Sequence, residues 1–231
     1  MNTMFKIGGG LIAFGIATEI VYQVYLRWKG KRKDKDPQII TDVLFFPDKR
    51  VACLDFFHKP KGCANKNCRY SHSDNSLSEL YRHLSSAKKC LDVCVYTICC
   101  KELCDILISH HKRGVAVRVV TDNDQLNLTG AQVWRLRSEG VPVRTGNSSY
   151  YMHHKFVIVD RELLLNGSFN WTRQAITGNQ ENLIVMNIPH VVNKYLGEFE
   201  KLWVEFNPAN VHKSELHAEA KVQLVNGEEK W

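Results

Sequence analysis

The 231-residue sequence lacks an internal repeat, so a motif that occurs once in it has no second copy in the same chain. It also lacks a small-x-small cleavage site after its N-terminal apolar segment, which disfavours a removed secretion signal. A strong charge excess is missing from most of the chain. Of the formal net charge of +7, residues 1–36 carry +4 through seven basic and three acidic side chains. Only +3 remains for the other residues, so bulk charge does not decide which anionic substrate the protein would take.

With 44% hydrophobic and 24% charged residues, the composition is ordinary for a globular protein whose length suits one hydrophobic core. Without a secretion signal, eight cysteines indicate a reducing compartment, where thiols serve as metal ligands or small buried side chains rather than in disulfides. Five of them have no histidine at metal-ligand spacing, and we interpret these as core thiols: Cys90, Cys94, Cys99, Cys100 and Cys104.

One long apolar segment stands at the N-terminus. From Ile7 to Leu26, 17 of 20 residues are apolar or glycine, which is enough to cross a bilayer core of about 30 Å. Glu19 opposes this, because a carboxylate near mid-span costs on the order of a few kcal/mol. The basic residues that follow predict a cytosolic position for the rest of the chain. We therefore predict a membrane anchor over residues 1–28 and a basic linker over residues 29–38. From physics alone, an outer mitochondrial and an endoplasmic reticulum destination are both open.

The densest group of chemically active side chains is His153-x-Lys155-x4-Asp160. The apolar run 156–159 predicts a short strand with His153 at its head, and the two-residue period puts His153 and Lys155 on one face. A neutral imidazole beside an ammonium suits nucleophilic attack on a phosphodiester. Asp160 has the opposite parity and is expected to support the turn, although it stays among the candidate catalytic residues. On its own, a His and a Lys two residues apart are more often a solvated strand face.

A second polar stretch, Gly167-Ser168-x-Asn170, follows the next apolar run. Such a stretch can bring backbone N–H groups, a hydroxyl and an amide to the start of a helix, which is a natural anion site. Gly-Ser is by itself usually a turn. Its conjunction with the preceding His-x-Lys motif makes Ser168 and Asn170 candidate catalytic residues.

A further constellation is Cys53-x9-Cys63-x4-Cys68-x3-His72. Three thiolates and an imidazole are the ligands of a tetrahedral structural zinc site. We therefore predict a small zinc finger over residues 53–72. Two alternatives stay open: His58 as the fourth ligand, and four unrelated residues of a loop.

The alternation of apolar patterns predicts an α/β domain over residues 39–206, with a sheet covered by helices on both faces. A capping box at Ser76 and Glu79 is expected to open the first helix. Residues 207–231 are polar and typical of a disordered tail. The expected strands are 41–46, 91–98, 115–121, 141–144, 156–159 and 182–187, and the expected helices are 76–89, 101–113, 130–138 and 189–206.

These patterns together resemble a known family. His153-x-Lys155-x4-Asp160, the Gly-Ser-x-Asn stretch and the later Glu181-Asn182 are similar to the signature of the phospholipase D superfamily. The small size, the single motif, the N-terminal apolar segment and the Cys/His cluster resemble its mitochondrial phospholipase D group, the Zucchini group. The resemblance runs from about residue 40 to residue 206. It implies a phospholipase D-like mixed sheet flanked by helices, with the zinc finger as an insertion.

The resemblance also implies how a single motif completes an active site. Two chains pair about a twofold axis as a homodimer, and both His153 side chains face one phosphate. One His153 attacks to form a phosphohistidine, while the other serves as general acid and then as base. Glu181 is carried over as the partner of His153 Nδ1, and Lys155 and Asn170 as ligands of phosphate oxygens. No catalytic metal is required.

Two substrate classes follow from the resemblance: single-stranded RNA, cut in the piRNA maturation that accompanies meiosis, and cardiolipin, hydrolysed to phosphatidate at the outer mitochondrial membrane. The zinc finger with its neighbours Phe56, Phe57 and Tyr70 favours RNA, because aromatic side chains stack on unpaired bases. The anchor favours the lipid. A rival of a different class is a catalytically inert RNA-binding scaffold on the mitochondrial surface, which the intact motif residues disfavour.

Overall fold

A computed structural model describes residues 18–26, 39–146 and 150–210. The chain divides into two compact units, Met1–Ile39 and Ile40–Trp231. Within the first unit, residues 18–26 are helical, and no helix among the described residues has the length and apolar character that crossing a bilayer requires. The remainder of the predicted anchor, the whole linker 29–38 and residues 211–231 of the predicted tail lie outside the described residues.

The second unit is built on a seven-stranded mixed sheet with the order β1-β7-β6-β5-β2-β3-β4. β2 pairs in parallel with β3, and β3 with β4, whereas the other neighbours are antiparallel. This agrees with the mixed sheet that the family resemblance implied. The strands are β1 (Thr41–Phe46), β2 (Cys90–Val95), β3 (Ala116–Asp122), β4 (Val143–Gly146), β5 (Lys155–Val159), β6 (Leu163–Gly167) and β7 (Glu181–Met186).

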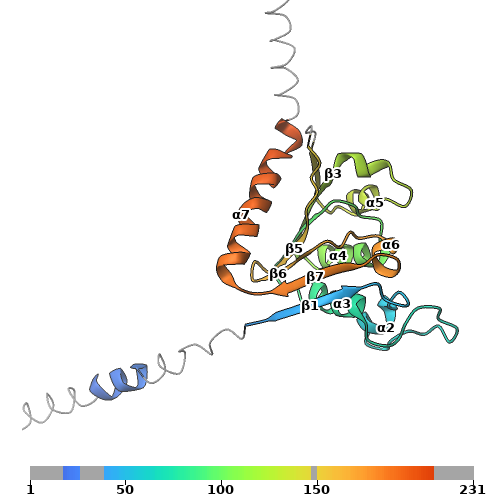
Figure 1. The fold of residues 1–231 in the computed structure, drawn as a ribbon. Helices are drawn as coiled ribbons and strands as arrows, with labels where there is room; N and C mark the ends of the chain where they lie inside the picture. The colour runs from blue at the N-terminus through green and yellow to red at the C-terminus, as the bar shows by residue number, and fades with distance from the viewer. Residues whose placement is uncertain (1–17, 27–38, 147–149, 211–231) are drawn as a thin grey trace, which may run out of the picture. The chain divides into compact units, whose positions relative to one another are not determined.

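Helices cover both faces of the sheet, as predicted (Figure 1). One core contains apolar residues of α3, α4, α5 and α6, and the other is closed by α7. In β5, Val157 and Val159 enter the first core while Phe156 and Ile158 enter the second, which explains its unbroken apolar run. The helical segments are α2 (Leu54–His58), α3 (Ser76–Ser85), α4 (Lys101–Lys112), the 3-10 helix η1 (Asn123–Asn127), α5 (Val133–Ser138), α6 (Arg173–Thr177) and α7 (Pro189–Glu205).

The start of α3 corrects one sequence prediction. Asn75, not Ser76, is the N-cap: its side chain accepts a hydrogen bond from the backbone N–H of Ser78 at 2.9 Å, and Ser78 Oγ accepts one from the backbone N–H of Asn75 at 2.9 Å. Ser76 Oγ instead donates to the carbonyl of Phe45 at 2.6 Å, and Glu79 pairs with Arg82. The capping box therefore exists one residue earlier than its sequence pattern indicated.

Two other helix boundaries also differ from the prediction. The helix α3 ends at Ser85 rather than near residue 89, because the backbone N–H groups of residues 88–90 bind the side chain of Asp160 instead of continuing the helix. The helix α5 begins at Val133 rather than at Gly130, whose φ of +84° belongs to a turn. The short segments α2 and η1 had no periodicity that could have predicted them.

Asp160 organises the turn after β5. Its backbone has a φ of 54°, and its carboxylate accepts hydrogen bonds from the N–H groups of Lys88, Lys89 and Cys90 at 2.9, 2.7 and 2.9 Å. Burial raises the pKa of Asp160, but these three donors outweigh that effect and hold the pKa below its ordinary value. Asp160, counted among the candidate catalytic residues, thus lies at the end of β5 remote from His153 and joins two connections of the fold.

Replacing Asp160 with alanine is expected to lower the free energy of unfolding at neutral pH by about 2–4 kcal/mol, because three backbone donors lose a charged acceptor. The folded-state pKa is depressed, so this contribution is complete above the unfolded pKa of about 3.9 and is lost as pH falls through the folded pKa. Urea denaturation of both proteins between pH 7 and pH 3 should show the two curves converging in acid. Asp160→Asn keeps an acceptor and tolerates positive φ, so it should lose less; equal stability of Asp160→Ala and wild type at pH 7 would contradict the role.

Candidate active site and metal centre

The candidate catalytic residues meet at one edge of the sheet. β2, β3 and β6 end at this edge, and β5 and β7 begin there. Lys155 opens β5 opposite Val95, and the backbone N–H of Tyr96 donates to the carbonyl of His154 at 2.8 Å. This bond extends the β2–β5 pairing beyond the strand ends and fixes the backbone that carries His153.

His153 and Lys155 lie together, as their spacing predicted. Lys155 Nζ is 3.0 Å from His153 Nδ1 and donates to the carbonyl of His153 at 2.8 Å. Lys155 is only 8% exposed, and burial lowers its pKa, against the opposing charge of Glu181. Burial and the neighbouring ammonium lower the pKa of His153, and the carboxylate of Asp122 opposes them. At neutral pH the imidazole is therefore mainly neutral, the form that a nucleophile requires.

Ser168 and Glu181 form a second part of this edge. Ser168 Oγ donates to the carboxylate of Glu181 and accepts from the backbone N–H of Asn182 at 3.1 Å. Glu181 also accepts from Asn179 Nδ2 at 2.9 Å. Gly167 is needed beside them, because a Cβ on this residue would lie 1.9 Å from the carbonyl oxygen of Asn182.

Within one chain, the hydrogen bonds of Glu181 go to residues other than His153, so its implied role as the partner of His153 Nδ1 stays a prediction for the homodimer. His153 Nδ1 faces Lys155 Nζ, whereas the hydrogen bonds of Glu181 go to Ser168 and Asn179. Its charge acts on the pKa of Lys155 and does not contribute to the pKa shift of His153. In this single chain, Glu181 is thus a neighbour of the ammonium rather than the partner of the imidazole.

The Gly-Ser-x-Asn stretch also differs from its expected geometry. It does not open a helix: α6 begins at Arg173, and the side chain of Thr172 caps it by accepting from the backbone N–H of Ala175 at 3.0 Å. The N–H of Thr172 donates to the carbonyl of Asn170 at 2.9 Å. Asn170 Oδ1 is buried and has no hydrogen-bond partner within the described part of the chain. A buried acceptor of this kind suits a donor supplied by a substrate or by a second chain.

Two further residues lie at this edge that no sequence motif indicated. The ring centroid of Tyr96 lies 4.6 Å from that of His153, and Asp122 Oδ2 accepts from the backbone N–H of Met152 at 2.8 Å. Both residues stand at the ends of neighbouring parallel strands, and this common position is the signal that could have identified them. An open groove of about 320 Å³ adjoins His153, lined by residues that include the exposed Tyr150 and Tyr151.

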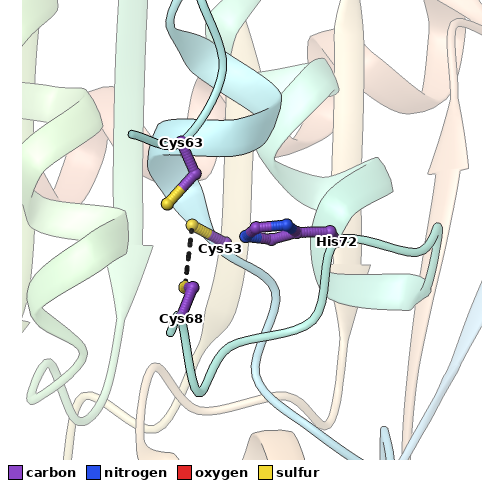
Figure 2. Close-up of side chains that lie close together, drawn as sticks. All are labelled: Cys53, Cys63, Cys68 and His72. Atoms are coloured by element: carbon purple, nitrogen blue, oxygen red, sulfur yellow. Dashed lines mark hydrogen bonds between the residues drawn. The ribbon is translucent and has the colours of Figure 1, made fainter. Parts of the chain in front are cut away.

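The four predicted zinc ligands come together in the structure, as Figure 2 shows. One ligand atom from each of Cys53, Cys63, Cys68 and His72 lies within 4.8 Å of all the others. Cys53 Sγ and Cys68 Sγ are 3.7 Å apart, close to the roughly 3.8 Å between sulfurs of a tetrahedral zinc with Zn–S bonds of about 2.3 Å. The donor set and its spacing therefore fit zinc.

The surroundings of the cluster decide between the alternative ligands. His58 Nδ1 lies 3.1 Å from Ser85 Oγ and does not belong to the cluster, whereas His72 does. Phe56 stacks on the His72 ring at 4.5 Å, and burial is the main cause that raises the pKa of Cys53 to about 11. His72 is accordingly the fourth candidate ligand.

The chain is similar to a known protein family and to several known proteins. Residues 80–203 match the family described as cardiolipin synthase, PLD-like domain. Proteins named mitochondrial cardiolipin hydrolase are similar along much of their length: that of Xenopus tropicalis is 40% identical over 89% of this chain and 92% of the relative, and that of Homo sapiens is 38% identical over 79% and 73%. The alignments with the frog and human relatives extend over 207 and 192 residues. Alignments that cover so much of this chain include the region of its His-x-Lys motif.

Two solved structures have folds similar to that of this chain. The phospholipase D family member Nuc from Salmonella typhimurium superposes with a TM-score of 0.57 at 23% identity, covering 74% of this chain and 97% of Nuc. NucT from Helicobacter pylori superposes with a TM-score of 0.55 at 18% identity, covering 73% and 98%. At these identities the two structures support the fold alone.

Proposed function

The chain belongs to the PLD-like family, the phospholipase D superfamily of hydrolases, and from this premise we propose that it is a homodimeric phosphodiesterase that acts through a phosphohistidine on His153. The observation that carries the proposal is the contact between the exposed imidazole of His153 and the buried ammonium of Lys155. A neutral imidazole held beside a fixed positive charge joins a nucleophile to a group that stabilises negative charge on phosphoryl oxygens.

The chemical steps follow from these groups. Nε2 of one His153 attacks phosphorus, the N–P bond forms, and the P–O bond to the leaving group breaks with its electron pair on that oxygen. The partner's His153 enters the reaction in its protonated form and gives that proton to the leaving oxygen. Now neutral, it takes a proton from water, and the oxygen of this water attacks phosphorus, so that the N–P bond breaks with its electron pair on nitrogen. The described chain supplies one such histidine, so the second must come from another copy. The exposed position of His153 beside an open groove supports such pairing.

Lys155 also affects which tautomer the His153 imidazole adopts. When Nδ1 of a neutral imidazole accepts from the ammonium of Lys155, the proton of the ring resides on Nε2. Attack requires the opposite tautomer, with a lone pair on Nε2. When a phosphate oxygen of the substrate accepts the hydrogen bond from the Lys155 ammonium, His153 Nδ1 loses this donor and can carry the ring proton itself. Substrate binding would thereby convert His153 to its nucleophilic tautomer.

Cardiolipin is the substrate that we propose first, because the relatives that match most of this chain bear the name cardiolipin hydrolase. The sequence favoured RNA through Phe56, Phe57 and Tyr70. Of these rings, Phe57 packs against the core, Phe56 stacks on His72 while 41% exposed, and Tyr70 lies under Arg69 and Arg173. Single-stranded RNA remains a second candidate on a different observation: Tyr150 and Tyr151, 83% and 66% exposed, line the groove beside His153. The contact between His153 and Lys155 disfavours a catalytically inert scaffold, because binding RNA without cleaving it does not require an imidazole beside a buried ammonium.

We expect the purified full-length protein in detergent to release phosphatidate from cardiolipin vesicles in the presence of EDTA, because the ammonium of Lys155 takes the charge-stabilising part that Mg²⁺ plays in metal-dependent nucleases. End-labelled single-stranded RNA and DNA of one sequence test the second substrate, with 5′-phosphate and 3′-hydroxyl ends expected from attack by a protein nucleophile. Mass analysis of lipids and of new termini measures both. A 2′,3′-cyclic phosphate end, or activity lost in EDTA and restored by Mg²⁺, would exclude the histidine mechanism.

The apolar segment 7–26 is proposed to anchor the protein in the outer mitochondrial membrane, with the catalytic domain in the cytosol; the relatives named mitochondrial support the destination. Removal of residues 1–36 is expected to leave a soluble active enzyme, because this segment carries the longest apolar run of the sequence. Carbonate extraction of membranes from cells that express each form measures the attachment. Continued sedimentation of the truncated form with membranes would locate the attachment elsewhere.

We further propose that Cys53, Cys63, Cys68 and His72 hold a structural zinc, on the strength of the donor set and the spacing of the ligand atoms. The N–H of Cys53 donates to the carbonyl of Ser71 at 2.8 Å, which joins the two ends of the loop that carries these ligands. Zinc would tie the middle of the loop to these ends. It takes no part in the reaction.

A further inference from the structure

Tyr96 follows β2 directly, and its ring lies against the candidate active site. The ring centroid is 4.6 Å from that of His153 and 6.1 Å from that of Tyr151, and Lys155 Nζ lies 5.1 Å from it. Tyr96 belongs to neither hydrophobic core. Its aromatic ring is thus not part of the packing that joins the sheet to its helices, and its ring contacts are with residues around the site.

Hydrogen bonds hold Tyr96 at both its side chain and its backbone. Gln125 Nε2 donates to the Tyr96 hydroxyl at 2.9 Å, and Gln125 is itself oriented by Thr97 Oγ1, which donates to its Oε1 at 2.9 Å. Thr121 Oγ1 donates to the carbonyl of Tyr96 at 2.9 Å. Gln125 of the η1 segment therefore orients the Tyr96 ring, which lies against His153.

We propose that Tyr96, oriented by Gln125, is a positioning residue for phosphodiester cleavage: its ring fixes the plane of the His153 imidazole and keeps the Lys155 ammonium beside it. The inference rests on the proposed function, because it assigns the nucleophile to His153. The imidazole is on an exposed loop position, where it could otherwise rotate, and attack in line with the leaving oxygen requires one orientation. The ring face also attracts the ammonium through a cation–π contact.

Three single variants and one double variant separate positioning from packing. Tyr96→Leu removes the ring and is expected to lower kcat on the soluble diester bis(p-nitrophenyl) phosphate by about 10–100-fold with little change in KM, since a shift of about 1 Å in a reacting group can cost about 100-fold. Tyr96→Phe keeps the ring and loses only the hydroxyl bond, so its loss should be smaller. Gln125→Leu should lower kcat as much as Tyr96→Phe does, because each change removes the same hydrogen bond between Gln125 and the Tyr96 hydroxyl. The double variant Tyr96→Phe/Gln125→Leu should therefore have the same kcat as either single variant.

The pH profile provides a readout that a purely structural role would not change. Burial lowers the pKa of His153, and removal of the ring admits water to the imidazole, so the pKa should rise in Tyr96→Leu. The reaction needs the neutral imidazole, and the acid limb of the kcat profile should therefore move to higher pH. Lys155, Asp122 and His154, the charged and titratable groups that act on His153, are unchanged in every variant.

NMR titration of the His153 ring, assigned by its absence in His153→Asn, measures the same pKa without catalysis. Circular dichroism verifies that each variant is folded. Unchanged kcat in Tyr96→Leu, or a loss of kcat with an unmoved acid limb and an unmoved His153 titration, overturns the proposal. Should the wild-type protein itself lack phosphodiesterase activity, the proposed function fails, while the His153 titration still decides whether Tyr96 sets the environment of this imidazole.

Discussion

An enzyme in which asparagine replaces His153 is expected to lose at least about 10⁴-fold in kcat, because removal of a catalytic nucleophile typically costs 10⁴–10⁶-fold. An amide side chain cannot form the phosphorus–nitrogen bond that the mechanism requires. The neighbouring His154 provides a matched control: it lies on the other face, with its ring 5.7 Å from that of Phe156 and 3.8 Å from Glu198. His154→Asn should keep most of the activity, as measured on cardiolipin vesicles.

The same variant tests whether the active site is shared. In defined heterodimers of one wild-type and one His153→Asn chain, purified through two different affinity tags, we expect almost complete inactivity, because nucleophile and acid come from different chains. Labelling with a ³²P-phosphodiester should also yield no long-lived phosphohistidine when the acid is missing. Half of the wild-type activity in the heterodimer would mean that each chain holds a complete site, and the dimeric mechanism would have to be abandoned.

Replacing Cys63 or Cys68 with alanine is expected to abolish zinc binding and to unfold the loop 53–72. Structural zinc contributes on the order of 10 kcal/mol in isolated zinc fingers, and the loss of even about 4 kcal/mol would lower the thermal midpoint of a chain of this size by about 8–16 °C. Metal analysis and thermal denaturation measure the two effects. Cys99→Ala is the matched control, because Cys99 is partly buried outside the cluster and should alter neither.

Two outcomes would contradict this role of the cluster. Wild-type protein purified without chelators and free of zinc would show that the four ligand atoms gather for another reason. A zinc content that survives in Cys68→Ala would move the site away from these residues. A fall in kcat at low temperature, where the variant is still folded, would instead give the loop a part in the reaction.

The sequence could predict the parts of the fold that depend on local patterns. β1 was predicted with its observed bounds, and the unbroken apolar run of β5 was recognised because both faces of that strand are buried. The same-side placement of His153 and Lys155 followed from the two-residue period alone. The Cys/His cluster followed from ligand spacing, although the choice between His58 and His72 needed the folded loop.

What the sequence could not predict depends on contacts between distant segments. The end of α3 is set by Asp160, 72 residues beyond Lys88, so no helix propensity near residue 85 contains it. Tyr96 and Asp122 reach His153 only because β2 and β3 end at the edge where β5 begins. The partners of Glu181 likewise depend on the pairing of β6 with β7, which brings Ser168 beside it.

The burial of β5 in both cores has a further consequence for the timescale on which the nucleophile can move. Opening this strand locally would expose Phe156 and Ile158 to water on one side and Val157 and Val159 on the other. Such an opening costs nearly as much free energy as unfolding the whole domain, so amide protons along β5 should be among the slowest to exchange with solvent. His153 is therefore attached to a support that stays still through native-state fluctuations.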